Sequence, residues 1–217
     1  MLPPKSIKRR GLTSVCLLAV VVVLLSVVGA RPSPQYQSGL RFEISFPREL
    51  SNDTQDGRII LIISNRPGNE PRFQYDLYEP NTQLGFGLDV EDFGPGDVAV
   101  LDGSTFGFPL NSLDELPPGE YRVQAVLNRY ETFARSDGHT VVFPPDRGEG
   151  QHWNSKPGNF YNAPLTVHLD PSRGGTVRLS LDQEIPPIPE FQDTRWIKHV
   201  RIRSELISEF WGRPMYL

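Results

Sequence analysis

Short runs of alternating apolar and polar residues, separated by proline and glycine, restrict the fold of this chain more than any other feature. Among the 217 residues are 21 prolines and 19 glycines, and such frequent breaks favour short strands and turns over long helices. Residues alternate with a period of two in four runs, which is typical of strands with one buried face. These runs are residues 40–46, 121–127, 165–169 and 177–181. The pattern predicts an all-β fold.

Other segments add to this prediction. Residues 58–64 (RIILIIS) form a continuous apolar run rich in isoleucine, as expected for a strand buried on both faces. Brief strands are also expected at residues 74–78 and 140–143, and residues 84–90 alternate glycine with apolar residues. The turn at Gly174 and Gly175 predicts that the two runs beside it form a hairpin. A Pro-Gly turn before Tyr121 is typical of a late strand in immunoglobulin-like domains, so we expect an immunoglobulin-like β-sandwich.

The N-terminus has the layout of a secretory signal peptide. Basic residues at positions 5–10 precede an apolar run at 12–28, and the small residues Gly29 and Ala30 follow. We expect cleavage after Ala30 and a secreted or periplasmic location. The alternative is that residues 11–30 remain as a helix that anchors the chain in the membrane, since the run approaches the length of a spanning helix.

Composition argues against disulfide bonds and against some classes of binding partner. Cys16 is the single cysteine and lies within the expected signal peptide, so the rest of the chain must fold without a disulfide. Cleavage would remove four basic residues and no acidic ones, and would change the net charge from −4 to −8. A negative module is not expected to bind nucleic acid or an anionic membrane.

The expected domain organisation has four parts. Residues 1–30 are the signal peptide or anchor, and residues 31–183 the β-sandwich module. Residues 184–194 contain Ile-Pro-Pro-Ile-Pro, which predicts a stiff extended linker. Within residues 195–217, the apolar Val200, Ile202 and Leu206 alternate with charged residues, which predicts a strand that leads into a following domain. The alternative is that residues 196–217 fold back on the first domain.

The motifs of the common catalytic centres are absent from the sequence. It contains no Gly-x-Ser-x-Gly, no His-Glu-x-x-His, no phosphate-binding glycine loop and no cysteine pair for a metal. We therefore expect no catalytic residue and no cofactor in this chain. His139 and His152, with acidic residues nearby, are weak candidates for metal ligands; surface or structural histidines are the expected alternative.

The segment at residues 144–164 is the main candidate for a binding site. Long irregular loops are usually functional or disordered, and the aromatic content of this one argues against disorder. We take His152, Trp153, Phe160 and Tyr161 as candidate ligand-binding residues that would stack on a sugar ring or contact a protein. The alternative is that the three aromatic residues close one end of the sandwich.

Several phrases in the second half of the chain resemble a known family. They are LPPGEYRVQAVLN (116–128), YETF (130–133), RSDGHTV (135–141), EGQHWN (149–154), SLDQ (180–183), KHVRI (198–202) and EFWGRP (209–214). Together they are similar to the N-terminal β-sandwich region of secreted bacterial esterase-like proteins, which precedes an α/β-hydrolase domain of the enterochelin-esterase type. The resemblance covers residues 116–217 well and residues 40–113 by position.

The resemblance implies a non-catalytic accessory module, because the catalytic triad of that family belongs to the hydrolase domain. The module would position substrate or pack on a C-terminal α/β-hydrolase domain, its implied partner. The alternative, which follows from the aromatic loop and the export signal, is a stand-alone extracytoplasmic β-sandwich that binds a carbohydrate or a cell-surface protein.

Overall fold

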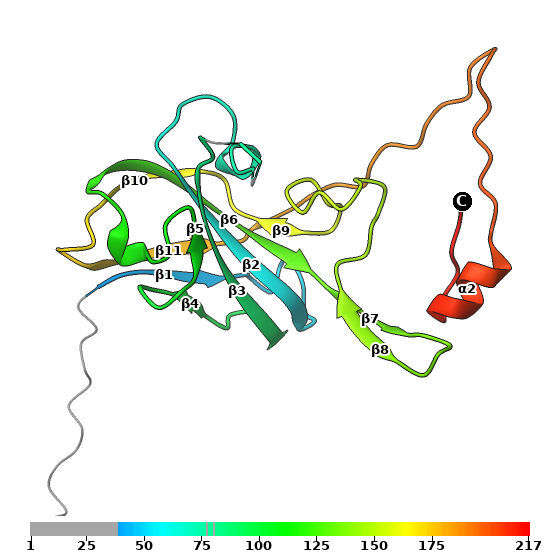
Figure 1. The fold of residues 1–217 in the computed structure, drawn as a ribbon, viewed down its shortest axis with the longest axis horizontal. Coiled ribbons are helices and arrows are strands. Elements are labelled where there is room, and N and C mark those ends of the chain that lie inside the picture. The colour runs from blue at the N-terminus through cyan, green and yellow to red at the C-terminus, as the bar shows by residue number, and fades with distance from the viewer. Residues whose placement is uncertain (1–38, 77, 80) are drawn as a thin grey trace, which may run out of the picture. The chain divides into compact units, whose positions relative to one another are not determined.

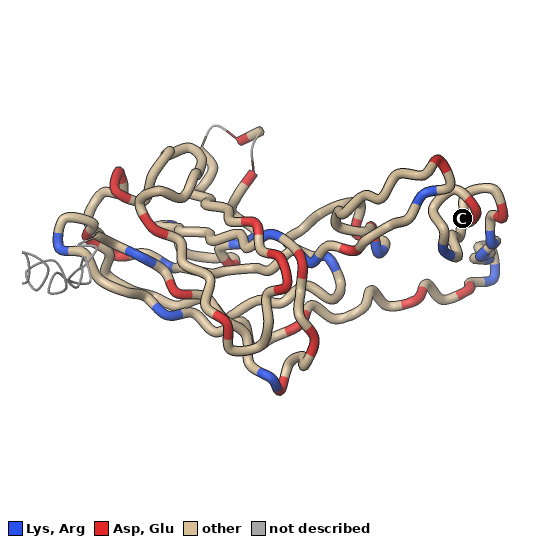
Figure 2. Tube along the Cα trace, turned by 90° about the horizontal axis from the view of Figure 1, so that it is seen from below, with Lys and Arg blue, Asp and Glu red and all other residues tan. Residues whose placement is uncertain are grey.

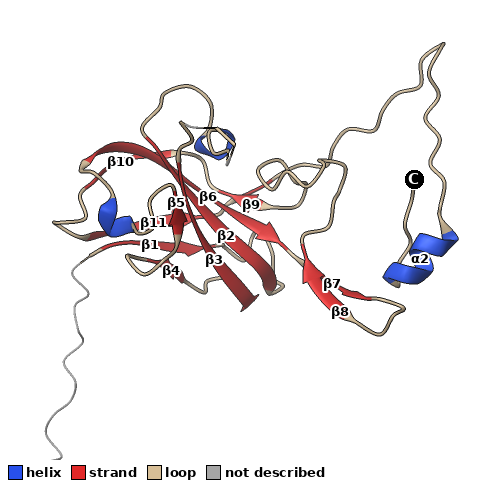
Figure 3. Cartoon of the chain, viewed as in Figure 1, coloured by secondary structure: helices blue, strands red, loops and turns tan. Residues whose placement is uncertain are grey.

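The computed structural model describes residues 39–76, 78–79 and 81–217. The expected signal peptide or anchor at residues 1–30 lies outside these residues. Within them, no helix combines the length and apolar character needed to cross a membrane. Strands dominate the described chain (Figure 3), which confirms the all-β prediction.

The described residues form twelve strands, two short 3-10 helices and one α-helix (Figure 1). The strands are β1 (Leu40–Ser45), β2 (Gln55–Ser64), β3 (Leu84–Phe93), β4 (Ala99–Leu101), β5 (Gly107–Phe108), β6 (Gly119–Arg129), β7 (Glu131–Ala134), β8 (Thr140–Phe143), β9 (Phe160–Tyr161), β10 (Leu165–Leu169), β11 (Gly175–Ser180) and β12 (Gln183–Glu184). The 3-10 helices are η1 (Pro71–Phe73) and η2 (Leu113–Glu115), and the α-helix is α2 (Glu205–Trp211).

The strands form two main sheets and a hairpin. The seven-stranded sheet has the order β12-β9-β6-β2-β3-β5, and β10 pairs with the first half of β6. The three-stranded sheet has the order β11-β1-β4. β1 and β11 are parallel, and all other pairs are antiparallel. The hairpin consists of β7 and β8.

The hydrophobic core contains residues from both main sheets, as the period of two requires. Alternate side chains of each central strand face this core and are buried. They include Phe42 and Ile44 of β1, Ile59, Leu61 and Ile63 of β2, and Val123, Ala125 and Leu127 of β6. Each large apolar side chain buried in this way contributes about 1.5–3 kcal/mol, so the core holds the chain without a disulfide.

The expected hairpin between residues 165–169 and 177–181 is wrong, although both strands are present. β10 pairs with β6 in the seven-stranded sheet, whereas β11 pairs with β1 in the three-stranded sheet. Leu169 and Leu179 are both buried in the core. The period of two specifies the buried face of a strand but does not specify its neighbour.

The expected strand at residues 74–78 is also wrong, because no strand occurs in the described part of this segment. It is preceded by η1, which Pro71 begins.

The expected strand at residues 195–217 is wrong, because helix α2 occupies residues 205–211. The Ser204 side chain accepts a hydrogen bond from the Ile207 N–H at 3.4 Å, and Gly212 ends the helix with a φ of 65°. Ser204 and Gly212 are ordinary helix-capping residues. They specify the ends of a helix here, whereas the alternation of Val200, Ile202 and Leu206 had predicted a strand. Trp211 packs on Phe133 and Phe143 of the β7–β8 hairpin, with both centroid distances 5.6 Å. The end of the chain therefore folds back on the earlier part.

A buried tyrosine fixes the turn that leads into β6. The Tyr121 hydroxyl donates a hydrogen bond to the Pro117 carbonyl at 2.8 Å. We expect Tyr121→Phe to lower the free energy of unfolding by about 0.5–1.5 kcal/mol, because the carbonyl loses its partner. Urea denaturation checks this value, with Tyr78→Phe as the control because Tyr78 is 93% exposed. Equal effects of the two substitutions would contradict the prediction.

Candidate functional site

An open groove with aromatic walls lies on the outer face of the seven-stranded sheet. Its volume is about 170 Å³. Ile59, Leu61 and Ile63 of β2 face the core, so the intervening Arg58 and Ile60 face outward. The principal side chains around the groove are Arg58, Ile60, Tyr75, Phe106, Phe108 and Trp153. We call this feature the aromatic groove.

Two glycines of β3 allow side chains to lie directly on the sheet. A Cβ atom at Gly85 would lie 2.5 Å from the Tyr75 ring, and one at Gly87 would lie 2.6 Å from Nε of Arg58. A side chain at either glycine would displace the Tyr75 ring or the Arg58 guanidinium, because these groups lie directly against the β3 backbone. The alternation of glycine with apolar residues in β3 therefore creates the floor of the aromatic groove.

Two of the aromatic rings around this floor are exposed and two are half-buried. Phe106 is 69% exposed and Phe108 is 43% exposed. Tyr75 and Trp153 are half-buried, and their centroids lie 6.4 Å apart in an edge-to-face arrangement. That geometry is favourable for an aromatic pair. Exposed apolar surface that clusters in one place is typical of an interaction site.

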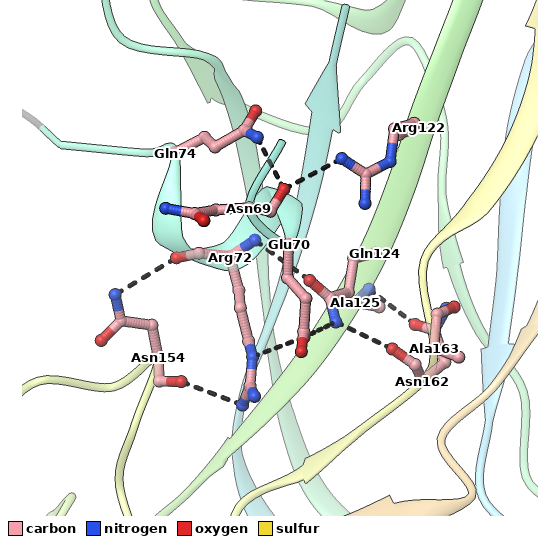
Figure 4. Close-up of polar contacts among 10 residues, drawn as sticks. All are labelled: Asn69, Glu70, Arg72, Gln74, Arg122, Gln124, Ala125, Asn154, Asn162 and Ala163. Atoms are coloured by element: carbon pink, nitrogen blue, oxygen red, sulfur yellow. Dashed lines mark hydrogen bonds and ion pairs between the residues drawn. The ribbon is translucent and has the colours of Figure 1, made fainter. Parts of the chain in front are cut away.

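A buried glutamine joins segments next to two residues of the aromatic groove, Tyr75 and Trp153, and Figure 4 shows its hydrogen bonds. Gln124 of β6 is completely buried. Its Oε1 accepts a hydrogen bond from the Arg72 backbone N–H at 3.0 Å. Its Nε2 donates to Glu70 at 2.7 Å and to the Asn162 carbonyl at 2.9 Å. One side chain thus ties the η1 segment and the chain after β9 to the centre of the sheet.

Arg72 extends this network to the segment that carries Trp153 (Figure 4). Its Nε donates to Glu70 at 2.9 Å, and its guanidinium donates to the Asn154 carbonyl at 3.1 Å. The Asn154 side chain donates in return to the Arg72 carbonyl at 3.2 Å. The guanidinium also lies 4.2 Å from the centroid of the Tyr161 ring. The walls are therefore held before a ligand arrives, which reduces the entropy lost on binding.

The structure separates the four candidate ligand-binding residues. Trp153 lines the aromatic groove, and its neighbour His152 is exposed. Phe160 is 1% exposed and packs on Phe46 in the core, so it offers no surface to a ligand. Tyr161 packs on Arg72. The interpretation that aromatic residues of this loop close the core is right for Phe160, and ligand binding by Trp153 stays a prediction.

Sequence reasoning missed most of the aromatic groove. Tyr75, Phe106 and Phe108 come from irregular or very short elements, where no periodicity marks an outward-facing side chain. The alternating glycines of β3 were the available signal, because glycine inside a strand often marks a close approach of another group.

The two histidines considered as metal ligands lie in surface segments. Nδ1 of His139 lies 3.3 Å from Asp137 in the β7–β8 turn, and His152 lies in the segment after β8. Across residues 39–76, 78–79 and 81–217, no three His, Cys, Asp or Glu side chains are grouped so that they could hold a metal ion.

A buried lysine lies beside β6. Lys156 is 2% exposed, and its Nζ donates a hydrogen bond to the Arg129 carbonyl. Burial, assisted by the nearby charge of Arg147, lowers the pKa of Lys156 to about 8. The folded chain therefore releases this proton more readily than the unfolded chain does.

This difference predicts how stability depends on pH. The unfolded chain binds more protons at Lys156 between pH 8 and pH 10, so stability from this group rises with pH in that window. Relative to Lys156→Met, the wild-type chain should gain about 2 kcal/mol between pH 8 and pH 10. Urea denaturation of both proteins across this range measures the difference. A difference that stays constant with pH would contradict the prediction.

Comparison with protein-family models, with curated proteins and with solved structures finds no match to this chain. The resemblance to the esterase-like proteins therefore stays a prediction.

Proposed function

We propose that this chain is a non-catalytic binding module whose aromatic groove holds a sugar ring. The observation that carries this proposal is the cluster of exposed aromatic rings around an open groove with a glycine floor. The groove of about 170 Å³ is smaller than the roughly 300–1,000 Å³ of sites that enclose a drug-sized ligand. Its size and openness are suited to a single ring held at the surface.

The chemistry of the lining is matched to a saccharide. One face of a sugar ring carries C–H groups, which pack favourably on the electron-rich face of an aromatic ring. The ring hydroxyls need polar partners at the edge. The Tyr75 hydroxyl, the Trp153 indole N–H and the Arg58 guanidinium can provide them.

The strand pairing supports an immunoglobulin-like sandwich as the scaffold. If β1, β2, β3, β4, β6 and β10 correspond to strands B, C, C′, E, F and G, then the observed pairs are B–E, C–F, C–C′ and F–G. These are pairs of that fold, and the Tyr121 hydrogen bond has the form of its tyrosine corner. β11 would take the place of strand A beside strand B. Trp153 then belongs to the F–G connection, which forms part of the binding surface in variable domains.

The cellular role that we propose is that of an accessory module in a secreted or periplasmic esterase-like protein. The module would bring substrate to a C-terminal α/β-hydrolase domain. The quoted phrases and the signal-like N-terminus support this role. Binding at the aromatic groove does not depend on it, because a stand-alone module would use the same surface.

Saccharide binding predicts a strong effect of one substitution. We expect Trp153→Ala to weaken binding about tenfold or more, because removal of a central aromatic contact commonly lowers affinity by 1–2 kcal/mol. A glycan array identifies a ligand for the wild-type chain, and calorimetry with that ligand compares the two proteins.

Trp196→Ala is the matched control, because Trp196 is 81% exposed and does not line the aromatic groove. Its affinity should equal that of the wild type. The proposal fails if the array retains no saccharide, or if both tryptophan substitutions have the same effect on binding.

A further inference from the structure

A segment before α2 combines exposed apolar residues with positive charge. We call residues 195–203 the basic segment. Trp196 is 81% exposed, Val200 is 71% exposed, and Ile197 and Ile202 are each 58% exposed. Exposed apolar residues at this density are typical of a surface that another molecule covers.

The charges of the basic segment all have one sign. It contains Arg195, Lys198, Arg201 and Arg203, and no aspartate or glutamate. Figure 2 shows positive positions near the C-terminus. Lys198 forms an ion pair with Asp193 at 3.2 Å, but both side chains are exposed and such a pair adds little stability. The positive charge therefore stays available to a partner.

The backbone of the basic segment is also available. Residues 198–201 belong to no helix or strand in the described chain. Ile202 exchanges backbone hydrogen bonds with Leu217 at 2.8 and 3.1 Å, and Arg203 forms an isolated bridge with Tyr216. The segment is tethered at both ends, because the His199 backbone N–H also donates to Asp193 at 2.9 Å. Within the described chain, the backbone groups of Lys198, Val200 and Arg201 make no hydrogen bond and can pair with another strand.

The seven-stranded sheet offers a complementary edge. β3 pairs with β2 along most of its length, but on its other side β5 pairs with Gly85 and Phe86 alone. The Gly87 N–H still points to that side, where it donates to the Phe106 carbonyl at 3.2 Å. Because alternate residues of a strand direct their backbone groups to the same side, Asp89 directs its N–H and C=O to this edge. We call residues 88–91 the β3 edge.

The side chains around the β3 edge are acidic. Asp89, Glu91, Asp92 and Asp97 are all exposed, and the exposed Val98 and Val100 follow closely in the chain. Asp89 forms an ion pair with Arg58 at 2.8 Å, but both side chains are exposed and such a pair adds little stability. Charged residues on an edge strand repel strands of like charge. The same charges favour a strand of opposite sign, so an acidic edge selects a basic strand.

We propose that the basic segment of one copy of this chain adds as a strand to the β3 edge of a second copy. Backbone hydrogen bonds would provide affinity, as in other cases of strand addition. Lys198 and Arg201 on one strand and Asp89 and Glu91 on the other would favour one register. Each copy carries both surfaces, so the association closes into a dimer or continues as a chain of copies.

A charge-exchange experiment tests this proposal with the unit from Ser38 to Leu217, which contains the whole described core. Sedimentation velocity over a range of protein concentrations should show association that weakens with salt. Lys198→Glu with Arg201→Glu should weaken it about tenfold or more, and Asp89→Lys with Glu91→Lys should do the same. An equimolar mixture of the two double variants should associate again, because the charges are opposite once more.

The matched control is Arg48→Glu with Arg173→Glu, which lowers the net charge by as much as the basic-segment variant does, at two exposed positions outside residues 88–100 and 195–203. This variant should associate as the wild type does. A wild-type unit that stays monomeric at all concentrations would overturn the proposal, as would a mixture that does not associate. Binding of the basic segment to vesicles that contain anionic lipid, without self-association, would assign it to a membrane surface instead.

Discussion

Replacement of Phe160 by alanine should lower the free energy of unfolding by about 3–5 kcal/mol. Phe160 is 1% exposed, lies 5.5 Å from the Phe46 ring and has the Arg129 guanidinium 4.6 Å from its centroid. The substitution would leave a cavity between the sheets and would remove a cation–π contact. Since small proteins are stable by about 5–15 kcal/mol, this is a large share of the total. Urea denaturation monitored by circular dichroism measures the loss.

The control for Phe160→Ala is Phe106→Ala, which removes the same atoms from a side chain that is 69% exposed. Its effect on stability should stay within about 0.5 kcal/mol. If Phe106 lines a ligand site, this variant should instead lose affinity for the ligand. Similar losses of stability in the two variants would show that Phe160 is not the core residue described above.

Replacement of Gln124 by leucine should lower the free energy of unfolding by about 2–4 kcal/mol. Leucine has a similar size but leaves the Arg72 N–H, the Asn162 carbonyl and one Glu70 contact without their partner. Each buried polar group that loses its partner destabilises the fold by about 1–3 kcal/mol, and the added apolar surface offsets part of this loss. Thermal and urea denaturation measure the change.

The control for Gln124→Leu is Gln192→Leu, because Gln192 is exposed and makes a single long hydrogen bond of 3.4 Å. Its effect should be within about 0.5 kcal/mol. Gln124→Leu should also speed proteolysis within residues 144–159, because Asn154 is held through Arg72. Unchanged proteolysis would show that the network does not restrain the segment that carries Trp153.

The predictions for Phe160 and Gln124 distinguish residues that stabilise the fold from residues that line the aromatic groove. Phe160 and Trp153 lie seven positions apart in the same aromatic-rich stretch, yet one is buried in the core and the other lines the aromatic groove. Composition identifies the stretch as important, but it does not assign the two roles. The assignment depends on β9, which pairs with β6 and β12 and directs Phe160 into the core.

Local patterns were sufficient for several strands of the two main sheets. The alternation in β1, β6, β10 and β11, and the apolar run in β2, identified segments that contribute buried side chains to the core. These predictions succeed because the faces of a strand follow from the residues of that strand alone. The failure at residues 74–78 occurred in irregular chain that follows a 3-10 helix, and the failure at residues 195–217 occurred where a capped helix formed from signals that the alternation hid.

The sequence by itself determined which faces are buried, that no disulfide is needed outside the expected signal peptide, and that the common catalytic motifs are missing. The tertiary structure alone decided that β10 and β11 lie in different sheets, and that Tyr75, Phe106 and Trp153 meet over the glycines of β3. The physical reason is the range of the interactions. Periodicity reports on neighbours a few residues apart, whereas strand partners and groove walls are selected by contacts between segments that lie tens of residues apart.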